Sequence, residues 1–204
     1  MIAIVDYGIG NLRSVEKALQ RVGADARLTA DPAALAGAQA IVLPGVGAFG
    51  DCAANLIGRG FEPAIREAVT ADVPLLGICV GMQLLFAESE EMGRHRGLAL
   101  LPGRVVRFPA GHKVPHIGWN QVHAERPSPL LEGLPQDSYA YFVHSYYAAP
   151  TDDSVVLATT DYGLAYASVV GRGRLFGVQF HPEKSQDVGL RLLANFCALA
   201  ERAP

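Results

Sequence analysis

The chain has 204 residues, of which 50% are hydrophobic, so it can form one domain with a sizeable core and does not need two. Its 17 basic and 20 acidic residues leave a net charge of −3 without any basic block, so we expect neither nucleic acid nor a membrane surface as a partner. The three cysteines, Cys52, Cys79 and Cys197, are too few and too odd in number for a disulfide framework, which favours a reducing, cytoplasmic location.

The first half of the chain alternates apolar runs with helical patterns. Residues 2–8, IAIVDYG, predict a buried strand, and they lack the basic lead and the cleavage site of a signal peptide. Asn11 is placed to cap a helix whose apolar residues recur at helical spacing, at Leu12, Val15, Leu19 and Val22. Further strands are expected at 24–29, 40–45 and 73–78, with a short helix opened by Asp31 and Pro32 and a longer helix at 61–70.

After about residue 98 the pattern changes to short strands separated by glycine and proline turns. Six strands are expected, at 103–109, 113–122, 138–149, 155–163, 166–173 and 174–180, followed by a helix at 188–203. Strands that alternate with helices predict a parallel sheet covered on both faces. The simplest interpretation of this pattern is a single α/β domain, residues 1–204, with an open mixed, mostly parallel sheet flanked by helices.

The stretch VPLLGICVGMQLLF, residues 73–86, places Cys79 between two glycines, where a strand gives way to a helix expected to begin at Met82. This apolar run is shorter than the roughly 20 residues of a membrane-spanning helix. The pattern Gly-x-Cys-x-Gly resembles a nucleophile elbow, in which crowding excludes side chains at Gly77 and Gly81. N–H groups at the start of the helix would favour a thiolate and then an oxyanion. The alternative is a structural cysteine in the core, and this stretch alone does not separate the two.

A nucleophilic thiol needs a base, and FGVQFHPEKS near the end of the chain offers one. His181 follows an apolar strand, and Glu183 lies two residues later, so both side chains can point to the same side. Glu183 would accept the ring N–H of His181 and leave the other ring nitrogen free for the sulfur. The alternative is a solvated histidine beside a surface glutamate. Taken without Cys79, the sequence His-Pro-Glu is only a weak indication of catalysis.

A third motif, PGVG, ends the strand expected at 40–45. Gly45 and Gly47 flank Val46 and allow unusual peptide orientations. If this loop lies beside the Cys79 turn, one of its N–H groups can join the Val80 N–H as an oxyanion hole. An ordinary tight turn between a strand and a helix would need no such chemistry.

Together, GICVGMQ and HPE resemble the class I (triad) glutamine amidotransferases. Five further segments, DYGIGNLRSV, PGVGAFGDC, VPHIGWNQV, YFVHSYY and FHPEKS, are similar to the glutaminase subunits of imidazole glycerol phosphate synthases, and they span nearly the whole chain. The resemblance implies a flavodoxin-like core. It also implies an enzyme that releases ammonia from L-glutamine and passes it to a synthase.

The resemblance also implies roles for individual residues. Cys79 would be the nucleophile, His181 the general acid/base and Glu183 its orienting group. The Val80 N–H and the peptide between Gly45 and Val46 would form the oxyanion hole, and in this family that peptide is expected to flip into place. The glutamine-binding set would be Gly47, Gln83, Glu91, Ser145 and Tyr146. Residues facing the synthase subunit would be Tyr7, Asn11, Trp119, Asn120, Tyr141 and Lys184.

The partner implied by the resemblance is a (β/α)₈-barrel cyclase in a heterodimer, acting in histidine biosynthesis. Ammonia would react there with a phosphorylated ribulosyl aminoimidazole nucleotide. The products would be imidazole glycerol phosphate and an aminoimidazole carboxamide ribonucleotide. No metal or organic cofactor is expected.

Other readings of the sequence remain open at this point. YGIGNLR lacks the third glycine of a dinucleotide loop, because Arg13 stands there. The histidines His112, His116 and His123 are expected to be solvated or to face a partner, since Pro115 prevents a regular helix that would place two of them together. Rival functions are a glutaminase for another synthase, a cysteine peptidase or small-molecule hydrolase, and a non-catalytic interaction module.

Overall fold

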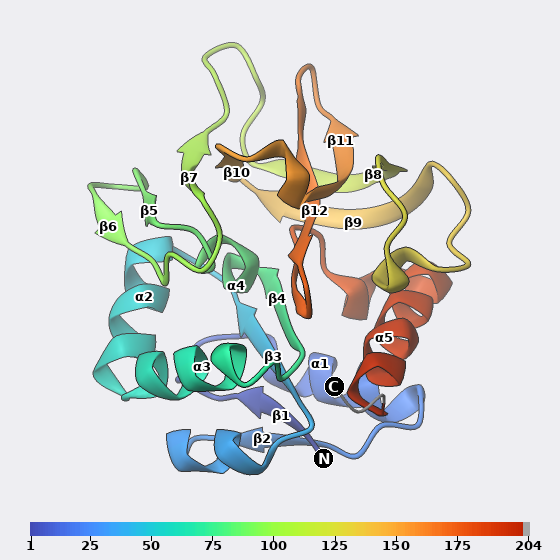
Figure 1. The fold of residues 1–204 in the computed structure, drawn as a ribbon. Helices are drawn as coiled ribbons and strands as arrows, with labels where there is room; N and C mark the ends of the chain where they lie inside the picture. Colours follow the sequence, from blue (N-terminus) through green and yellow to red (C-terminus); the bar gives the residue numbers. More distant parts are fainter. Residues whose placement is uncertain (202–204) are drawn as a thin grey trace.

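The computed structural model describes residues 1–201, and its larger sheet has nine strands in the order β2-β1-β3-β4-β13-β12-β11-β8-β9 (Figure 1). The strands are β1 (Ile2–Val5), β2 (Ala26–Thr29), β3 (Ala40–Gly45), β4 (Leu75–Cys79), β8 (His116–Ala124), β9 (Ser138–His144), β11 (Val156–Asp161), β12 (Ala165–Arg172) and β13 (Leu175–Val178). The single-domain α/β class and the mixed sheet are confirmed. The first five strands of the order pair in parallel and the rest in antiparallel fashion, so parallel pairings do not predominate in the described residues.

A second, four-stranded sheet has the order β10-β7-β5-β6. Its strands are β5 (Glu88–Ser89), β6 (His95–Arg96), β7 (Gly103–Arg107) and β10 (Tyr146–Pro150). The single strand expected at 138–149 is therefore broken at Ser145 into β9 and β10, which belong to different sheets. The carbonyl of Ser145 accepts a hydrogen bond from the Phe108 N–H at 3.2 Å, which holds the break in place.

Helices cover both faces of the parallel strands. They are α1 (Leu12–Arg21), α2 (Phe49–Gly58), α3 (Phe61–Thr70), α4 (Val80–Gln83) and α5 (Gln186–Glu201), with 3₁₀ turns at Pro32–Gly37, Pro129–Leu131, Asp153–Val155 and Pro182–Lys184. Helices α1 and α5 pack together on one face, and α2 and α3 pack together on the other (Figure 1). Asn11 occupies the N-cap position of α1, as predicted, but its side chain makes no capping hydrogen bond.

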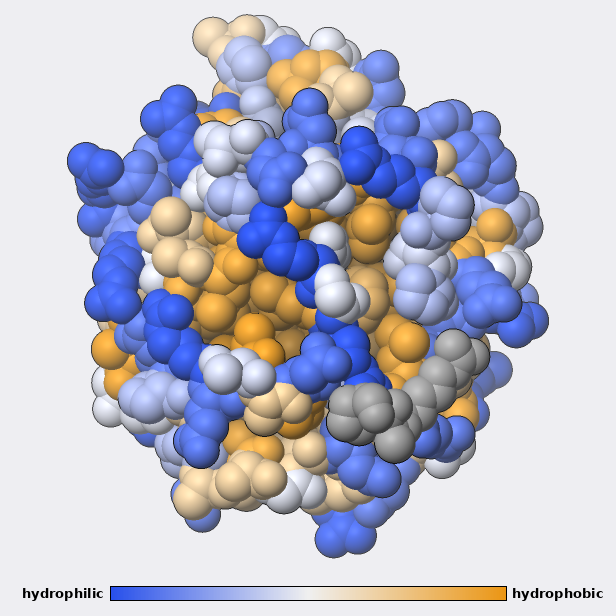
Figure 2. Space-filling view, in the orientation of Figure 1, coloured by the Kyte–Doolittle hydropathy of each residue, from blue (hydrophilic) through white to orange (hydrophobic). Residues whose placement is uncertain are grey.

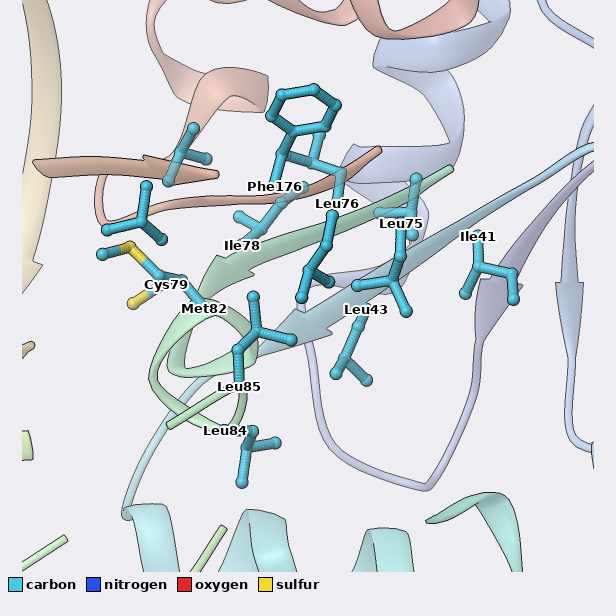
Figure 3. Close-up of a cluster of buried hydrophobic side chains, with 14 of the residues drawn as sticks. Ile41, Leu43, Leu75, Leu76, Ile78, Cys79, Met82, Leu84, Leu85 and Phe176 are labelled. Atoms are coloured by element: carbon cyan, nitrogen blue, oxygen red, sulfur yellow. The ribbon is translucent and has the colours of Figure 1, made fainter. Parts of the chain in front are cut away.

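The hydrophobic core between these layers lies directly behind Cys79. On β4, Leu75, Leu76 and Ile78 pack between β3 and β13, and the side chains of this cluster that Figure 3 labels on the three strands are at most 3% exposed. Burial of each such side chain stabilises the fold by about 1.5–3 kcal/mol. Figure 3 shows Cys79 and Met82 at the end of the cluster, so closely packed hydrophobic side chains support the turn that carries the sulfur.

The helix after Cys79 is earlier and shorter than expected. It begins at Val80 and ends at Gln83, because the following carbonyls are bonded to another segment. The N–H groups of Leu98, Ala99 and Leu100 donate to the carbonyls of residues 84, 86 and 85, at 2.7–3.0 Å. These hydrogen bonds replace the helical ones. Leu84 and Leu85 are buried in a turn, and Phe86 is buried in the bend that follows.

The last helix agrees with the expected one within two residues at its start. It begins at Gln186 instead of Val188, and Arg202 and Ala203, the end of the expected helix, lie outside the described residues.

Figure 2 shows hydrophobic residues gathered over the centre of one face, with hydrophilic residues around them. None of the helices within residues 1–201 has the length and apolar character needed to cross a membrane.

Candidate active site

Three motifs that are far apart in the sequence meet at one edge of the larger sheet. Strands β3, β4 and β13 are parallel neighbours, with Gly45 opposite Cys79 and Ile78 opposite Val178. The PGVG loop, the Cys79 turn and the segment 179–183 therefore leave the sheet side by side. The carboxyl ends of parallel strands are the usual location of ligand sites in open α/β sheets.

The Cys79 turn has the strained backbone of a nucleophile elbow. Cys79 has φ +56° and ψ −114°, a conformation that a residue with a side chain rarely adopts and that costs about 1–3 kcal/mol. A Cβ at Gly77 would lie 2.6 Å from the Gly81 carbonyl oxygen, and one at Gly81 would lie 1.8 Å from the Leu43 carbonyl oxygen. The flanking glycines are therefore required by crowding, as the sequence indicated.

We expect Gly81→Ala to destabilise the protein by about 3 kcal/mol or more, because backbone atoms, not a flexible side chain, occupy the space that the methyl group needs. Urea denaturation would measure the change. The control is Gly58→Ala at the end of α2, where a Cβ meets nothing within 4 Å. Equal stability of the two variants would contradict the crowding argument.

His181 and Glu183 form a buried pair beside this turn. The Nδ1–H of His181 donates to Oε1 of Glu183 at 2.8 Å, and the two side chains are 3% and 1% exposed. Burial alone would lower the pKa of His181, but the interactions with Cys79 and Glu183 outweigh it and raise that pKa to about 10. The other ring nitrogen, Nε2, is buried without a hydrogen-bond partner among the described residues. It is free to exchange a proton with the sulfur or with a bound molecule.

The loop of residues 44–47 lies against the elbow. A Cβ at Gly45 would lie 2.7 Å from the Gly81 nitrogen, and Gly47 has φ +85°. The hydroxyl of Tyr7 donates to the Pro44 carbonyl at 2.8 Å, and Tyr7 is fully buried. The structure therefore places the Tyr7 side chain behind this loop instead of on the surface where the resemblance put it.

A cavity of about 290 Å³ opens at Cys79 and His181. Its lining includes every residue expected to bind glutamine, Gly47, Gln83, Glu91, Ser145 and Tyr146, together with Val46, Val80, Val143, His144 and Lys184. The larger hollows among the described residues contain neither Cys79 nor His181, so the smaller cavity is the candidate site.

Gln179 belongs to this site and was missed from the sequence. Its Nε2 donates to Sγ of Cys79 at 3.8 Å, and its Oε1 accepts from Nε2 of Gln83 at 3.0 Å. Gln83 also donates to the Tyr146 carbonyl at 3.0 Å, so both protons of its amide are engaged and only its Oε1 is left to accept a hydrogen bond. The available signal was a polar residue within the apolar run before His181.

His144 is a second residue that the sequence did not single out. Its Nδ1–H donates to the Tyr146 carbonyl at 2.8 Å, and its Nε2 accepts from the Tyr166 hydroxyl at 3.2 Å. Burial lowers the pKa of His144 to about 3, so the ring is neutral at physiological pH. Tyr146 thus has its carbonyl fixed by two buried donors. Glu91 is oriented by the Phe49 N–H, which donates to its Oε2 at 2.7 Å.

Three of the residues expected to face a partner, Asn11, Tyr141 and Lys184, lie beside His181 and Glu183. Trp119 is 46% exposed and contacts Tyr141 with ring centroids 6.0 Å apart, and Nζ of Lys184 lies 5.8 Å from the Tyr141 ring centre. Nδ2 of Asn11 donates to Oε1 of Glu183 at 3.3 Å, and Nδ2 of Asn120 donates to the Asp161 carbonyl at 2.8 Å. We name Trp119, Tyr141 and Lys184 the aromatic patch.

Within residues 1–201, no three His, Cys, Asp or Glu side chains are grouped so that they could hold a metal ion. His116 was expected to be solvated or to face a partner, but it is buried and stacks on Tyr162 with ring centroids 4.0 Å apart. His123 is exposed and pairs with Asp137 at 2.8 Å.

Comparison with known proteins adds a family relationship to this geometry. The profile of the family described as glutamine amidotransferase class-I matches residues 3–199. Two curated proteins named imidazole glycerol phosphate synthase subunit HisH are close relatives. The one from Syntrophotalea carbinolica is 55% identical over 96% of this chain and 98% of its own, and the one from Moorella thermoacetica is 56% identical over 99% and 96%.

Solved structures share the fold at lower identity. A glutamine amidotransferase crystal structure has a TM-score of 0.80 with 24% identity over 98% of this chain and 99% of its own. A chain of PurLQS from Thermotoga maritima has a TM-score of 0.79 with 19% identity over 97% of each chain.

Proposed function

Because the chain belongs to the class-I glutamine amidotransferases, we propose that it is the glutaminase subunit of an imidazole glycerol phosphate synthase. It hydrolyses L-glutamine to glutamate and supplies the ammonia for histidine biosynthesis. The observation that carries the proposal is the position of Cys79, on a strained turn in the lining of a cavity and beside the buried His181–Glu183 pair. The curated relatives named HisH support the choice of synthase.

The reaction follows from the roles of these groups. The Cys79 thiol gives its proton to His181, and its sulfur attacks the carboxamide carbon of glutamine, whose oxygen becomes an oxyanion held by the N–H groups of Val80 and Val46. His181 gives its proton to the departing ammonia, which leaves a glutamyl thioester. Water then attacks the thioester carbon as His181 takes its proton. When the C–S bond breaks, His181 returns that proton to the sulfur, which releases glutamate and restores the Cys79 thiol. Glu183 orients the imidazole throughout.

The cavity offers suitable chemistry for a free amino acid. Glu91 and Oε1 of Gln83 would accept hydrogen bonds from the α-ammonium group, and the backbone around Gly47, Ser145 and Tyr146 would orient the carboxylate. The orientation of Glu91 by α2 and of Tyr146 by His144 supports a site formed before the substrate arrives. No metal or cofactor takes part in this proposal.

The proposed partner is a (β/α)₈-barrel cyclase that forms a heterodimer with this chain. The aromatic patch supports a docking surface close to His181 and Glu183, since its exposed tryptophan and half-buried tyrosine are of the residue types that typically anchor interfaces. Asn11 and Asn120 complete the proposed surface. The three cysteines are free, which agrees with the reducing cytoplasm that we propose as its location. Residues 1–204 would act as one glutaminase domain.

The test is ammonia release from glutamine by the chain alone, with the cyclase, and with the cyclase and its nucleotide ligand. We expect weak activity alone and an increase of about tenfold or more in the complex, because the peptide between Gly45 and Val46 needs the partner to present its N–H. Equal rates in all three conditions would contradict this gating. Co-purification with a different synthase would favour the rival glutaminase function.

A further inference from the structure

The 44–47 loop is held from behind by two buried hydrogen-bond donors on alternate carbonyls. The Tyr7 hydroxyl donates to the Pro44 carbonyl at 2.8 Å, and Sγ of Cys52 donates to the Val46 carbonyl at 3.3 Å. We propose that Tyr7 and Cys52 are positioning residues that set the direction in which the peptide between Gly45 and Val46 meets the substrate. The inference rests on the proposed function, because it assigns the Val46 N–H to the oxyanion hole.

The fold brings both donors to the loop. Tyr7 lies just beyond the end of β1, the strand that pairs with β3, and Cys52 lies in the first turn of α2, the helix that follows the loop. Both side chains have no exposed surface. Burial raises the pKa of Cys52 to about 11, so its thiol keeps the proton that it donates. Cys52 therefore does more than fill space in the core, because its thiol donates a hydrogen bond to the Val46 carbonyl.

The positions of the two acceptors explain how the donors would act. The Pro44 carbonyl belongs to the peptide plane before Gly45, and the Val46 carbonyl belongs to the plane after Val46. Fixing both planes leaves only the intervening peptide to turn, about the bonds on either side of it. Its environment is tight, because a Cβ at Gly45 would lie 2.9 Å from the Tyr7 hydroxyl oxygen and 2.7 Å from the Gly81 nitrogen. Loss of either donor would let one of the two flanking peptides rotate, so the Val46 N–H would no longer be held in a single direction.

An oxyanion-hole donor acts mainly in the transition state, so misplacing it lowers kcat more than it raises KM. Removal of a whole oxyanion donor costs about 10²–10³-fold in kcat, and a loosened one should cost a part of that. We expect Cys52→Ala to lower kcat about tenfold with KM changed less than twofold. Cys52→Ser, which keeps a donor of similar size, should restore most of the loss. Tyr7→Phe should act in the same direction as Cys52→Ala.

The assay uses the full chain with its cyclase and saturating nucleotide, with kcat and KM for glutamine and the midpoint of thermal unfolding measured for each variant. Alkylation of Cys79 by iodoacetamide, followed by mass spectrometry, reports the state of the nucleophile and should proceed at the wild-type rate. Equal kcat for the alanine variant and wild type would overturn the inference, as would equal losses in the alanine and serine variants. A wild-type complex that releases no ammonia from glutamine would instead refute the proposed function.

Discussion

Replacing Cys79 with serine is expected to lower glutamine-dependent ammonia release by about 10³-fold or more, with the fold intact. A serine hydroxyl fits where the thiol lies, but it is a much weaker nucleophile in a site built around a thiol. Cys79 is 3% exposed at the end of a packed cluster, so the isosteric change leaves that packing in place. The measurement is the steady-state rate of ammonia formation by the complex with the cyclase.

The matched control is Cys197→Ser, the same chemical change at a half-buried cysteine of α5 that does not line the cavity. This control should keep the wild-type rate. Turnover that survives in the Cys79 variant would refute the assignment of the nucleophile. Formation of imidazole glycerol phosphate from added ammonium salts should persist in both variants, because that step belongs to the proposed cyclase.

Glu183→Gln is expected to lower kcat/KM for glutamine by about 10²–10⁴-fold and to change its pH dependence. The carboxylate of Glu183 accepts the His181 Nδ1–H at 2.8 Å and helps to raise the pKa of His181 to about 10. A neutral amide removes that support, so the pKa of His181 falls. The alkaline limb of the activity profile, where the imidazolium loses its proton, therefore moves to lower pH. Rates measured between pH 6 and about 10.5 would show the shift.

Glu67→Gln on the exposed side of α3 is the control, since it makes the same charge change outside the cavity. It should leave both the rate and the alkaline limb where they are in the wild type. An unchanged alkaline limb in the Glu183 variant would show that this carboxylate does not set the proton affinity of His181.

The sequence predicted the parts of the site that depend on local crowding. The need for glycine at positions 77 and 81 could be predicted, because a nucleophile turn needs neighbours without side chains. The structure agrees, since a Cβ at either position would collide with backbone atoms. The pairing of His181 with Glu183 could be predicted, because residues two apart in an extended segment point their side chains to the same side of that segment. The convergence of these segments could be expected only from their resemblance to a family.

The parts that were missed depend on contacts between distant segments. Gln179 reaches Cys79 across one hundred positions of sequence, and nothing within its own segment predicts that contact. Tyr7 was placed on a surface because its motif lies at an interface in the family, while the structure buries its ring behind the 44–47 loop. The helix expected to begin at Met82 instead begins at Val80 and ends at Gln83, because the 97–101 segment donates to the carbonyls that follow. No local propensity encodes that competition.

The place of β13 in the sheet has a consequence for synthesis on the ribosome. This strand is among the last to be made, yet it lies between β4 and β12, in the middle of the order. Until it emerges, β4 has an open edge, and Cys79 has been made without the histidine that would activate it. The nascent chain therefore contains Cys79 without its proposed base while residues 80–180 are made. The proposed active site and the central sheet are therefore completed together, once β13 and the segment through Glu183 have been made.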